Sequence, residues 1–226
     1  MTFSIVARDT SGGTTRFGVA ASSSSPAVAA RVAHLRPGIG AAASQNITDP
    51  RLGSRLLDEL AEHGDAERAL RAVTTGADDI EYRQLTVLGP TGSGFARSGA
   101  RTLGTHGSAT GDGVVAAGNM LTGDHIPRAI VEAFSAAGGE LEQRLVTALR
   151  AGLSAGGEEG PVRSAGVVVV SDVDWPITDL RVDWADDPID RLAELLDVWL
   201  PQRDDYVTRG LDPASAPSYG VPGDES

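Results

Sequence analysis

The chain has 226 residues, of which 41% are hydrophobic, so we expect a globular protein of one domain, or at most two, with a substantial core. The net charge of −12 disfavours nucleic acid and anionic membranes as partners, and the absence of cysteine excludes disulfides, thiol nucleophiles and thiolate metal sites. All 19 basic residues are arginines, so no lysine is present to form a Schiff base or to act as a general base.

Hydrophobic periodicity and turn residues divide the chain into alternating groups of strands and helices. In chain order the pattern predicts strands at 2–8, 17–22 and 38–45, helices at 50–63 and 66–76, strands at 82–88, 94–98 and 114–118, helices at 124–136 and 139–155, strands at 164–171 and 177–183, and a last helix at 188–200. Aspartate followed by proline marks two of the helix starts, at Asp49-Pro50 and Asp187-Pro188. Residues 99–113 are rich in glycine and are predicted to form a loop.

The strands mostly form antiparallel hairpins and the helices come in pairs, an order that predicts a layered α+β fold rather than a doubly wound parallel sheet. No repeat and no linker interrupts residues 2–200, so we expect a single domain there. Residues 201–226 are rich in Pro, Gly, Asp and Ser and are predicted to form a loosely ordered tail. No apolar run approaches the roughly 20 residues needed to cross a bilayer, and no leader pattern is visible, so we expect a soluble, cytoplasmic protein.

Thr2 is the first candidate for a catalytic residue. Initiator methionine is normally removed when the second residue is small, which would leave Thr2 with a hydroxyl and a free α-amine on one residue. In that arrangement the amine serves as general base for its own side chain. An α-amine with a pKa of about 7.7 to 8.0 is partly deprotonated at neutral pH, so no second residue is needed for this role. The alternative is that Thr2 merely begins an edge strand.

Several other kinds of site are disfavoured by the sequence. A chain without lysine has no P-loop, and no Gly-x-Gly-x-x-Gly is placed to bind a dinucleotide between a strand and a helix. The four histidines are scattered without helical metal-binding spacing, so we expect no metal site and no cofactor. The acidic pair Glu158-Glu159 is interpreted as a solvated charge pair.

Three further stretches carry candidate site residues. Asn119 leaves a buried strand, where its amide side chain is either a donor to an oxyanion or part of a left-handed turn. Ser164 opens an apolar strand, either as a site residue or as a strand cap. Asp179, Arg181 and Asp183 lie on one face of a strand because side chains alternate, and they form either a site or a structural ion network.

Five stretches together resemble one protein family. MTFSIVARD, PGIGAAASQ, GNML, RSAGVVVV and DLRVDWADDPI follow one another as in the DUF1028 family, which is placed in the N-terminal nucleophile (Ntn) hydrolase superfamily. The resemblance covers roughly residues 2–200, and GNML and DLRVD are its most specific parts. It implies a four-layer αββα sandwich, in which two antiparallel sheets pack face to face with paired helices outside, as in proteasome subunits.

The resemblance also implies roles for individual residues. Thr2 would be the exposed nucleophile at the start of the first strand. A backbone amide in the turn around Ser44, Gln45 and Asn46 would contribute to the oxyanion hole.

Related enzymes place an acid after the second strand and a lysine on the third, and this chain departs from both patterns. Ser22 and Ser23 stand at the end of the second predicted strand in place of the acid, and Arg36 is the available cation. Ser23 and Arg36 are therefore candidate substrate-binding residues. We therefore expect the α-amine of the nucleophile to act alone or through water.

Two functions fit these observations. The first is an amidohydrolase in which Thr2 attacks a small amide or related acyl substrate, while Asn119 and amides near Gln45 hold the oxyanion. Asp179 and Arg181 would orient the amine or bind a substrate carboxylate. The second is a non-catalytic small-molecule binding protein or assembly subunit that retains the fold, because one fold hosts many functions. The expected partners are a small-molecule substrate and further copies of the chain in a homo-oligomer, without nucleic acid or membrane.

Overall fold

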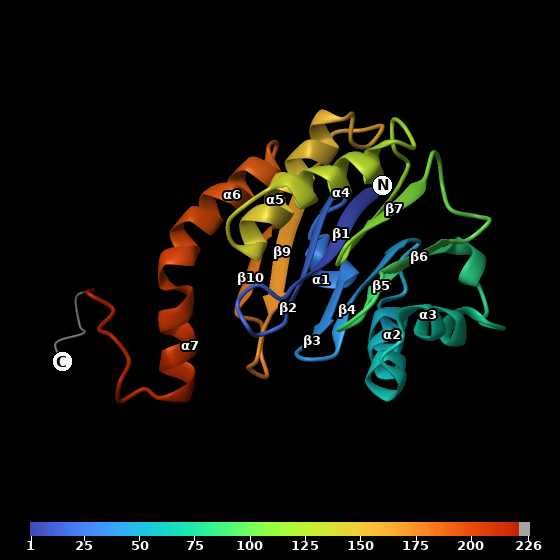
Figure 1. Ribbon diagram of the computed structural model, residues 1–226. Coiled ribbons are helices and arrows are strands. Elements are labelled where there is room, and N and C mark those ends of the chain that lie inside the picture. The colour runs from blue at the N-terminus through green and yellow to red at the C-terminus, as the bar shows by residue number, and fades with distance from the viewer. Residues whose placement is uncertain (222–226) are drawn as a thin grey trace.

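The computed structural model describes residues 1–221 and contains two antiparallel sheets packed face to face. The larger sheet has the strand order β10-β9-β2-β1-β8-β7, and the smaller sheet has the order β3-β4-β5-β6 (Figure 1). The strands are β1 (Thr2–Asp9), β2 (Arg16–Ser23), β3 (Ala33–Arg36), β4 (Gly40–Asn46), β5 (Arg83–Leu88), β6 (Phe95–Ser98), β7 (Gly107–Gly111), β8 (Val114–Asn119), β9 (Ser164–Val170) and β10 (Thr178–Val182).

Helices cover the outer faces of both sheets, which gives four layers (Figure 1). The helices are α1 (Ala29–Val32), α2 (Pro50–His63), α3 (Ala66–Thr74), α4 (Ile126–Ala136), α5 (Leu141–Ser154), α6 (Pro188–Trp199) and α7 (Arg203–Leu211), with short 3₁₀ turns η1 (Ile80–Tyr82) and η2 (Leu200–Gln202). Helices α4, α5 and α6 pack on the larger sheet, and α2 and α3 pack on the smaller one. The expected α+β fold of two antiparallel sheets between helices is confirmed. Within residues 1–221, no helix is both long and apolar enough for a membrane crossing.

Alternation along β1 builds an apolar core on each face of the larger sheet. Phe3 and Ile5 are fully buried in the cluster beneath α4 and α5. Val6 points to the opposite face and packs in the apolar cluster between the two sheets. Thr2 and Ser4 share the face of Val6 because side chains on one face recur every second residue. The N-terminal end of β1 therefore brings two hydroxyl groups into the layer between the sheets.

Capping residues set the boundaries of α2 and α3. The Asp49 side chain accepts a hydrogen bond from the backbone nitrogen of Arg51, and Pro50 takes the first helical position. Gly64 ends α2 in the left-handed region, with φ of 69°. Asp65 then caps α3 through the backbone nitrogen of Arg68. Both helices begin where the sequence predicts and α2 also ends there, whereas α3 ends at Thr74, two residues before its predicted end.

The prediction of a loop over residues 99–113 is wrong in part, because this segment contains β7. This strand pairs with β8 in a register that places Gly107 opposite Gly118. Its small residues have little intrinsic preference for a strand, so pairing with β8 and packing against α4 decide its structure. Helix α1 and strand β3 were likewise not predicted, although β3 forms one edge of the smaller sheet.

The C-terminal segment is not loosely ordered throughout, because η2 and α7 follow directly after α6. Arg203, at the start of α7, is 9% exposed. Its guanidinium donates to Glu140 at 3.0 Å and to Glu142, a fully buried carboxylate of α5, at 3.1 Å. This ion network ties α7 to the N-terminal end of α5, a long-range contact that local composition does not reveal. The last part of the predicted tail, 222–226, lies outside the described residues.

Candidate functional site

Thr2 begins β1 near the middle of the larger sheet, with its side chain in the layer between the sheets. Asn119, the last residue of β8, is its cross-strand partner on one side. On the other side, the end of β2 brings Ser23 beside it. Thr2 is 7% exposed, so the nucleophile that the family resemblance implies is buried while Met1 is attached.

The carbonyl group of Met1 is the acceptor on which the polar groups of this site converge. The Thr2 hydroxyl donates to the Met1 oxygen at 2.5 Å, and the Ser23 hydroxyl donates to the same oxygen at 2.5 Å. The Ser23 oxygen in turn accepts a hydrogen bond from the backbone nitrogen of Ser25 at 3.1 Å. The site therefore holds the Thr2 hydroxyl next to a carbonyl group whose oxygen receives two hydrogen bonds.

A chain of buried polar side chains links this part of β1 to the smaller sheet. Ser4 Oγ donates to Gln45 Oε1 at 2.7 Å, and Gln45 Nε2 donates to Gln84 Oε1 at 2.7 Å. Asn119 Nδ2 donates to the same Gln84 oxygen at 3.1 Å, and Gln84 Nε2 donates to Ser98 Oγ at 2.8 Å. The network crosses the layer between the sheets and fixes the side chain of Asn119, which lies beside Thr2.

Asn119 lies next to Thr2 as expected, but its hydrogen bonding differs from the predicted role. Its amide nitrogen, the expected oxyanion donor, is directed to Gln84 on the smaller sheet. Its Oδ1 atom is buried and has no hydrogen-bond partner among the residues that the structure describes. The group that remains available beside Thr2 is thus an acceptor, which suits an amine or another donor.

Glu158 was interpreted as solvated, but it is 4% exposed. Its backbone forms a bridge with Leu121, just beyond β8, and its Oε2 atom accepts from the backbone nitrogen of Ser24 at 3.1 Å. Its Oε1 atom has no partner within residues 1–221. Burial raises the pKa of Glu158 to about 7, against the opposing effects of the Ser24 hydrogen bonds and the positive N-terminal amine. A buried carboxylate therefore lies near the chain start.

Ser164 and Ser44 are buried, and their hydroxyls form hydrogen bonds to carbonyl groups of nearby backbone. Ser164 pairs in register with Ser23, and its hydroxyl donates to the Ser25 carbonyl oxygen at 2.6 Å. It thereby holds the loop that follows β2. Ser44 points away from Thr2, toward α2, where its hydroxyl donates to the Asp49 carbonyl oxygen at 2.8 Å. The Ser44 side chain therefore serves the start of α2, and the role of a backbone amide in this turn stays a prediction.

Asn46 and Gln45 end β4 at the same end of the sandwich as Thr2. Asn46 has φ of 74°, and its Nδ2 donates to the Tyr82 carbonyl oxygen at 2.5 Å, so its side chain closes the turn after β4. Gln45 joins the network through Ser4, two residues along β1 from Thr2. Among the three residues of the predicted oxyanion turn, Gln45 is the one whose side chain points toward β1.

The structure does not bring Asp179 and Arg181 to Thr2, so their predicted roles are wrong. They lie on β10, at the edge of the sheet, and β9 and β2 separate them from β1. Asp179 pairs in register with Val168, well along β9 from Ser164. The two side chains form an exposed ion pair, with Arg181 Nε 2.7 Å from Asp179 Oδ1. The structural alternative for this charged face is the correct one.

Arg36 is also distant from the predicted site. It pairs in register with Gly40, at the opposite end of β4 from Gln45. Its guanidinium forms an exposed ion pair with Asp58 of α2 at 2.7 Å. The cation that was expected near the nucleophile therefore stabilises the surface between β3 and α2.

Two surface features carry no chemistry of this site. Glu59, Glu62 and His63 bring ligand-type atoms within 4.8 Å of one another at the end of α2, a spacing not recognised in the sequence, but Arg68 Nη2 lies 3.0 Å from the imidazole. A Gly-x-Ser-x-Gly sequence at 152–156 belongs to the last turn of α5 and the residues after it, not to a strand-to-helix turn. Neither feature contacts Thr2.

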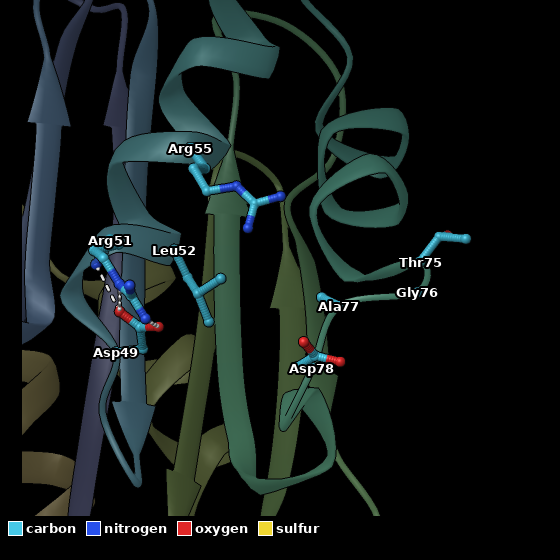
Figure 2. A pocket seen from close by; sticks show the side chains of 8 residues that line it. All are labelled: Asp49, Arg51, Leu52, Arg55, Thr75, Gly76, Ala77 and Asp78. Carbon is cyan, nitrogen blue, oxygen red and sulfur yellow. Dashed lines mark hydrogen bonds and ion pairs between the residues drawn. The ribbon is translucent and has the colours of Figure 1, made fainter.

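A cavity of about 430 Å³ lies between α2 and the segment after α3 (Figure 2). It is lined by Asp49, Arg51, Leu52, Arg55, Thr75, Gly76, Ala77 and Asp78. Arg51 is paired with Asp49, whereas Arg55 extends between the two helices in Figure 2. This cavity is on the helix side of the smaller sheet, and Thr2 faces the other side of that sheet.

Glu158 and Gln84 are the site residues that the sequence did not identify. Alternation along β5 places Gln84 on the face of Thr86 and Leu88, so its inward direction follows from the same period-two pattern that orients Ser4. Glu158 had no comparable signal, because the surrounding Gly-Gly-Glu-Glu-Gly has the composition of an exposed loop.

Comparison with known proteins establishes the family. The model of the family of unknown function DUF1028 matches residues 2–192. The chain belongs to the DUF1028 family. The crystal structure of SPO2555 from Silicibacter pomeroyi, described with the same family, is 31% identical and has a TM-score of 0.82, covering 91% of this chain and 89% of that chain. A search of curated proteins finds no match.

A second solved structure, Anbu (ancestral beta-subunit) from Yersinia bercovieri, is 13% identical. It covers 88% of this chain and 97% of that chain, with a TM-score of 0.40. Nothing about activity follows from a likeness this distant. The DUF1028 match includes Thr2, Ser23 and Glu158 but ends before α7.

Proposed function

We propose that the chain is an N-terminal-threonine hydrolase that cleaves a small amide or related acyl substrate after Met1 has been removed. The observation that carries this proposal is the convergence of the Thr2 and Ser23 hydroxyls on one carbonyl oxygen. The sequence resemblance to a family placed among the Ntn hydrolases supports it. No lysine or cysteine offers a competing nucleophile.

In the proposed reaction the neutral α-amine of Thr2 takes the proton from Oγ1 as this oxygen attacks the acyl carbon of the substrate. The C–N bond of the tetrahedral intermediate then breaks, and the amine returns the proton to the leaving nitrogen. Water hydrolyses the resulting ester on Thr2 and restores its hydroxyl. An α-amine can both accept and return this proton, so one group serves both steps.

Ser23 is the proposed donor to the negatively charged oxygen that develops during the attack. Its hydroxyl already donates to a carbonyl oxygen beside Thr2, which is the geometry that such a donor requires. The unpartnered Asn119 Oδ1 is the proposed acceptor for the protonated amine. These roles use the same groups that contact or flank Met1 in the uncleaved chain.

The test begins with the intact mass of the purified protein, which is expected to show loss of Met1. An epoxyketone, which reacts with the hydroxyl and amine of an N-terminal threonine together, should then label Thr2. Thr2→Ala should abolish labelling and hydrolysis across an amide panel while the protein stays folded, and Thr2→Ser should retain part of both. Thr14→Ala, the same change at an exposed threonine, is the matched control.

Two results would contradict the proposal. One is retention of Met1 in most molecules, which leaves no free amine on Thr2. The other is a fully active Thr2→Ala protein. A trimmed protein that is neither labelled nor active would instead support a non-catalytic binding or assembly function.

A further inference from the structure

Met1 lies where the acyl part of a substrate would lie in the proposed reaction. Two carbon atoms separate the nitrogen of a threonine from its hydroxyl oxygen, so an acyl group bonded to one atom is close to the other. The Met1 carbonyl oxygen accepts from the Thr2 hydroxyl at 2.5 Å, in agreement with this relation. The surroundings of Met1 therefore indicate which groups an acyl-enzyme on Thr2 would meet.

The loop before β9 lies close to Met1. The α-ammonium of Met1 is the positive charge that opposes the effect of burial on the pKa of Glu158. The Met1 side chain lies over Gly160, where an added Cβ would come within 3.2 Å of Met1 Cε. The charge of the Met1 amine thus acts on the Glu158 carboxylate without a direct ion pair among the described residues, and Gly160, which has no side chain, leaves room for the side chain of Met1.

Glu158 has unused hydrogen-bonding capacity at this position. Its Oε2 atom accepts from the Ser24 backbone, while its Oε1 atom is buried and unpartnered within the described chain. Ser24 and Leu121, whose backbones contact Glu158, have neutral side chains. A buried carboxylate in such surroundings is costly unless a cation or donors complete it. An ammonium group on a ligand would supply both.

We propose that the substrate of Thr2 is an α-aminoacyl compound, an amino acid amide or a peptide with a free N-terminus, whose ammonium group is bound by Glu158. This inference rests on the proposed function of Thr2. The amide C–N bond breaks, the amino acid is carried as an ester on Thr2 Oγ1, and water releases it, so no further reactant is needed. An N-acylated substrate has no ammonium group and leaves Glu158 without a counter-charge. The chain then acts as an aminopeptidase-type hydrolase.

The test compares three fluorogenic amides of 7-amino-4-methylcoumarin on the Met1-trimmed protein. Their acyl groups are methionyl, N-acetylmethionyl and 4-(methylthio)butanoyl, which is methionyl without its amine. We expect kcat/KM to be at least about tenfold higher for the methionyl compound, because its ammonium group alone can pair with the carboxylate. Labelling rates of free-amine and N-acetyl methionine epoxyketones give the same comparison where turnover is slow.

Glu158→Gln tests the proposed partner while keeping the size of the side chain and an acceptor for the Ser24 amide. It should lower kcat/KM for the methionyl compound by about tenfold and lower that for the 4-(methylthio)butanoyl compound by a clearly smaller factor. Glu159→Gln, the same change at the exposed neighbour, should preserve the preference. The comparison on the unaltered protein needs no variant, so it stands even if Glu158→Gln folds poorly.

The possible failures are distinguishable. Equal rates for all three compounds on the unaltered protein would overturn the aminoacyl inference and leave Thr2 as the nucleophile. A preference for the methionyl compound that Glu158→Gln does not reduce would overturn the role of Glu158. Absence of both hydrolysis and epoxyketone labelling of Thr2 would overturn the proposed function, and this inference with it.

Discussion

The hydroxyl oxygens of Thr2 and Ser23 lie 3.4 Å apart, and both groups donate to the carbonyl oxygen of Met1. Thr2 begins β1 and Ser23 ends β2, which are neighbouring antiparallel strands in the middle of the larger sheet. Strand pairing therefore sets their spacing. A backbone hydrogen bond from Ser25 to the Ser23 oxygen leaves the Ser23 proton free to point at the carbonyl.

Ser23→Ala is expected to slow the reaction of Thr2 by about 10²-fold, because it removes a donor aimed at the developing oxyanion. The rate of labelling by a methionine epoxyketone, or kcat for a cleaved amide, measures the loss. Ser22→Ala is the matched control, because the Ser22 hydroxyl donates to the Ser164 carbonyl oxygen instead, at 3.0 Å. Equal rates for Ser23→Ala and the unaltered protein would show that the hydroxyl does not act on the oxyanion.

Gln84→Leu is expected to lower the free energy of unfolding by about 3 kcal/mol. The change removes the acceptor shared by Gln45 and Asn119 and the donor to Ser98, and it leaves the buried amide groups of Gln45 and Asn119 unpaired. Urea unfolding followed by circular dichroism measures the loss.

Thr86→Val provides the control for Gln84, two residues along the same strand. The Thr86 hydroxyl is buried and has no hydrogen-bond partner within the described residues, so replacing it with a methyl group leaves no new group unpaired. The free energy of unfolding should stay within about 0.5 kcal/mol of the original or rise. A loss as large as that of Gln84→Leu would mean that packing, not the polar network, explains both values.

Arg203→Met is expected to destabilise the protein by about 3 kcal/mol, because Glu142 is fully buried and would lose its cationic partner. Neutralising that carboxylate in the double variant with Glu142→Gln should recover part of the loss. Arg191→Ala, which removes an exposed pair with Glu194, should change stability by less than about 0.5 kcal/mol. Equal effects of the two arginine changes in thermal unfolding would argue against a buried anchor for α7.

The sequence predicted elements whose determinants are local. Asp49 and Gly64 act within one turn of the helix that they bound, and alternation along β1 decides which side chains reach each core. Strand β7 was not predicted because its small residues form a strand only through pairing with β8. Helix α7 was not predicted because its Arg203 is held by Glu142, a buried residue 61 positions earlier in the chain.

The sequence identified part of the candidate site, because the predicted residues Ser23 and Asn119 do lie beside Thr2. Alternation correctly put Asp179 and Arg181 on one face, yet it could not tell that the face is exposed or that two strands separate it from β1. Glu158 shows the opposite error, because a bridge to Leu121 and a hydrogen bond from Ser24 bury a residue whose neighbours are glycines. Both outcomes depend on strand order and register, which short patterns do not encode.

Glu158 is expected to make the protein less stable as pH rises from about 4.5 to about 7. Burial holds its pKa in the folded protein at about 7, above the ordinary value of 4.5, so the folded state keeps a proton that the unfolded state has lost over this interval. The stabilising contribution is complete below the ordinary pKa and disappears as pH passes the folded pKa. Its size is up to about 3 kcal/mol, since each pKa unit corresponds to about 1.4 kcal/mol.

Urea unfolding at several pH values between about 5 and about 8 tests this expectation. Glutamine does not titrate, so the free energy of unfolding of Glu158→Gln, relative to the unaltered protein, should rise across this range. Glu159→Gln alters an exposed carboxylate next to it and should follow the unaltered protein at every pH. A difference in the free energy of unfolding between Glu158→Gln and the unaltered protein that stayed constant with pH would mean that Glu158 titrates alike in the folded and unfolded states. Glu158 would then not be the buried, partly protonated carboxyl group proposed to bind an ammonium group beside Thr2.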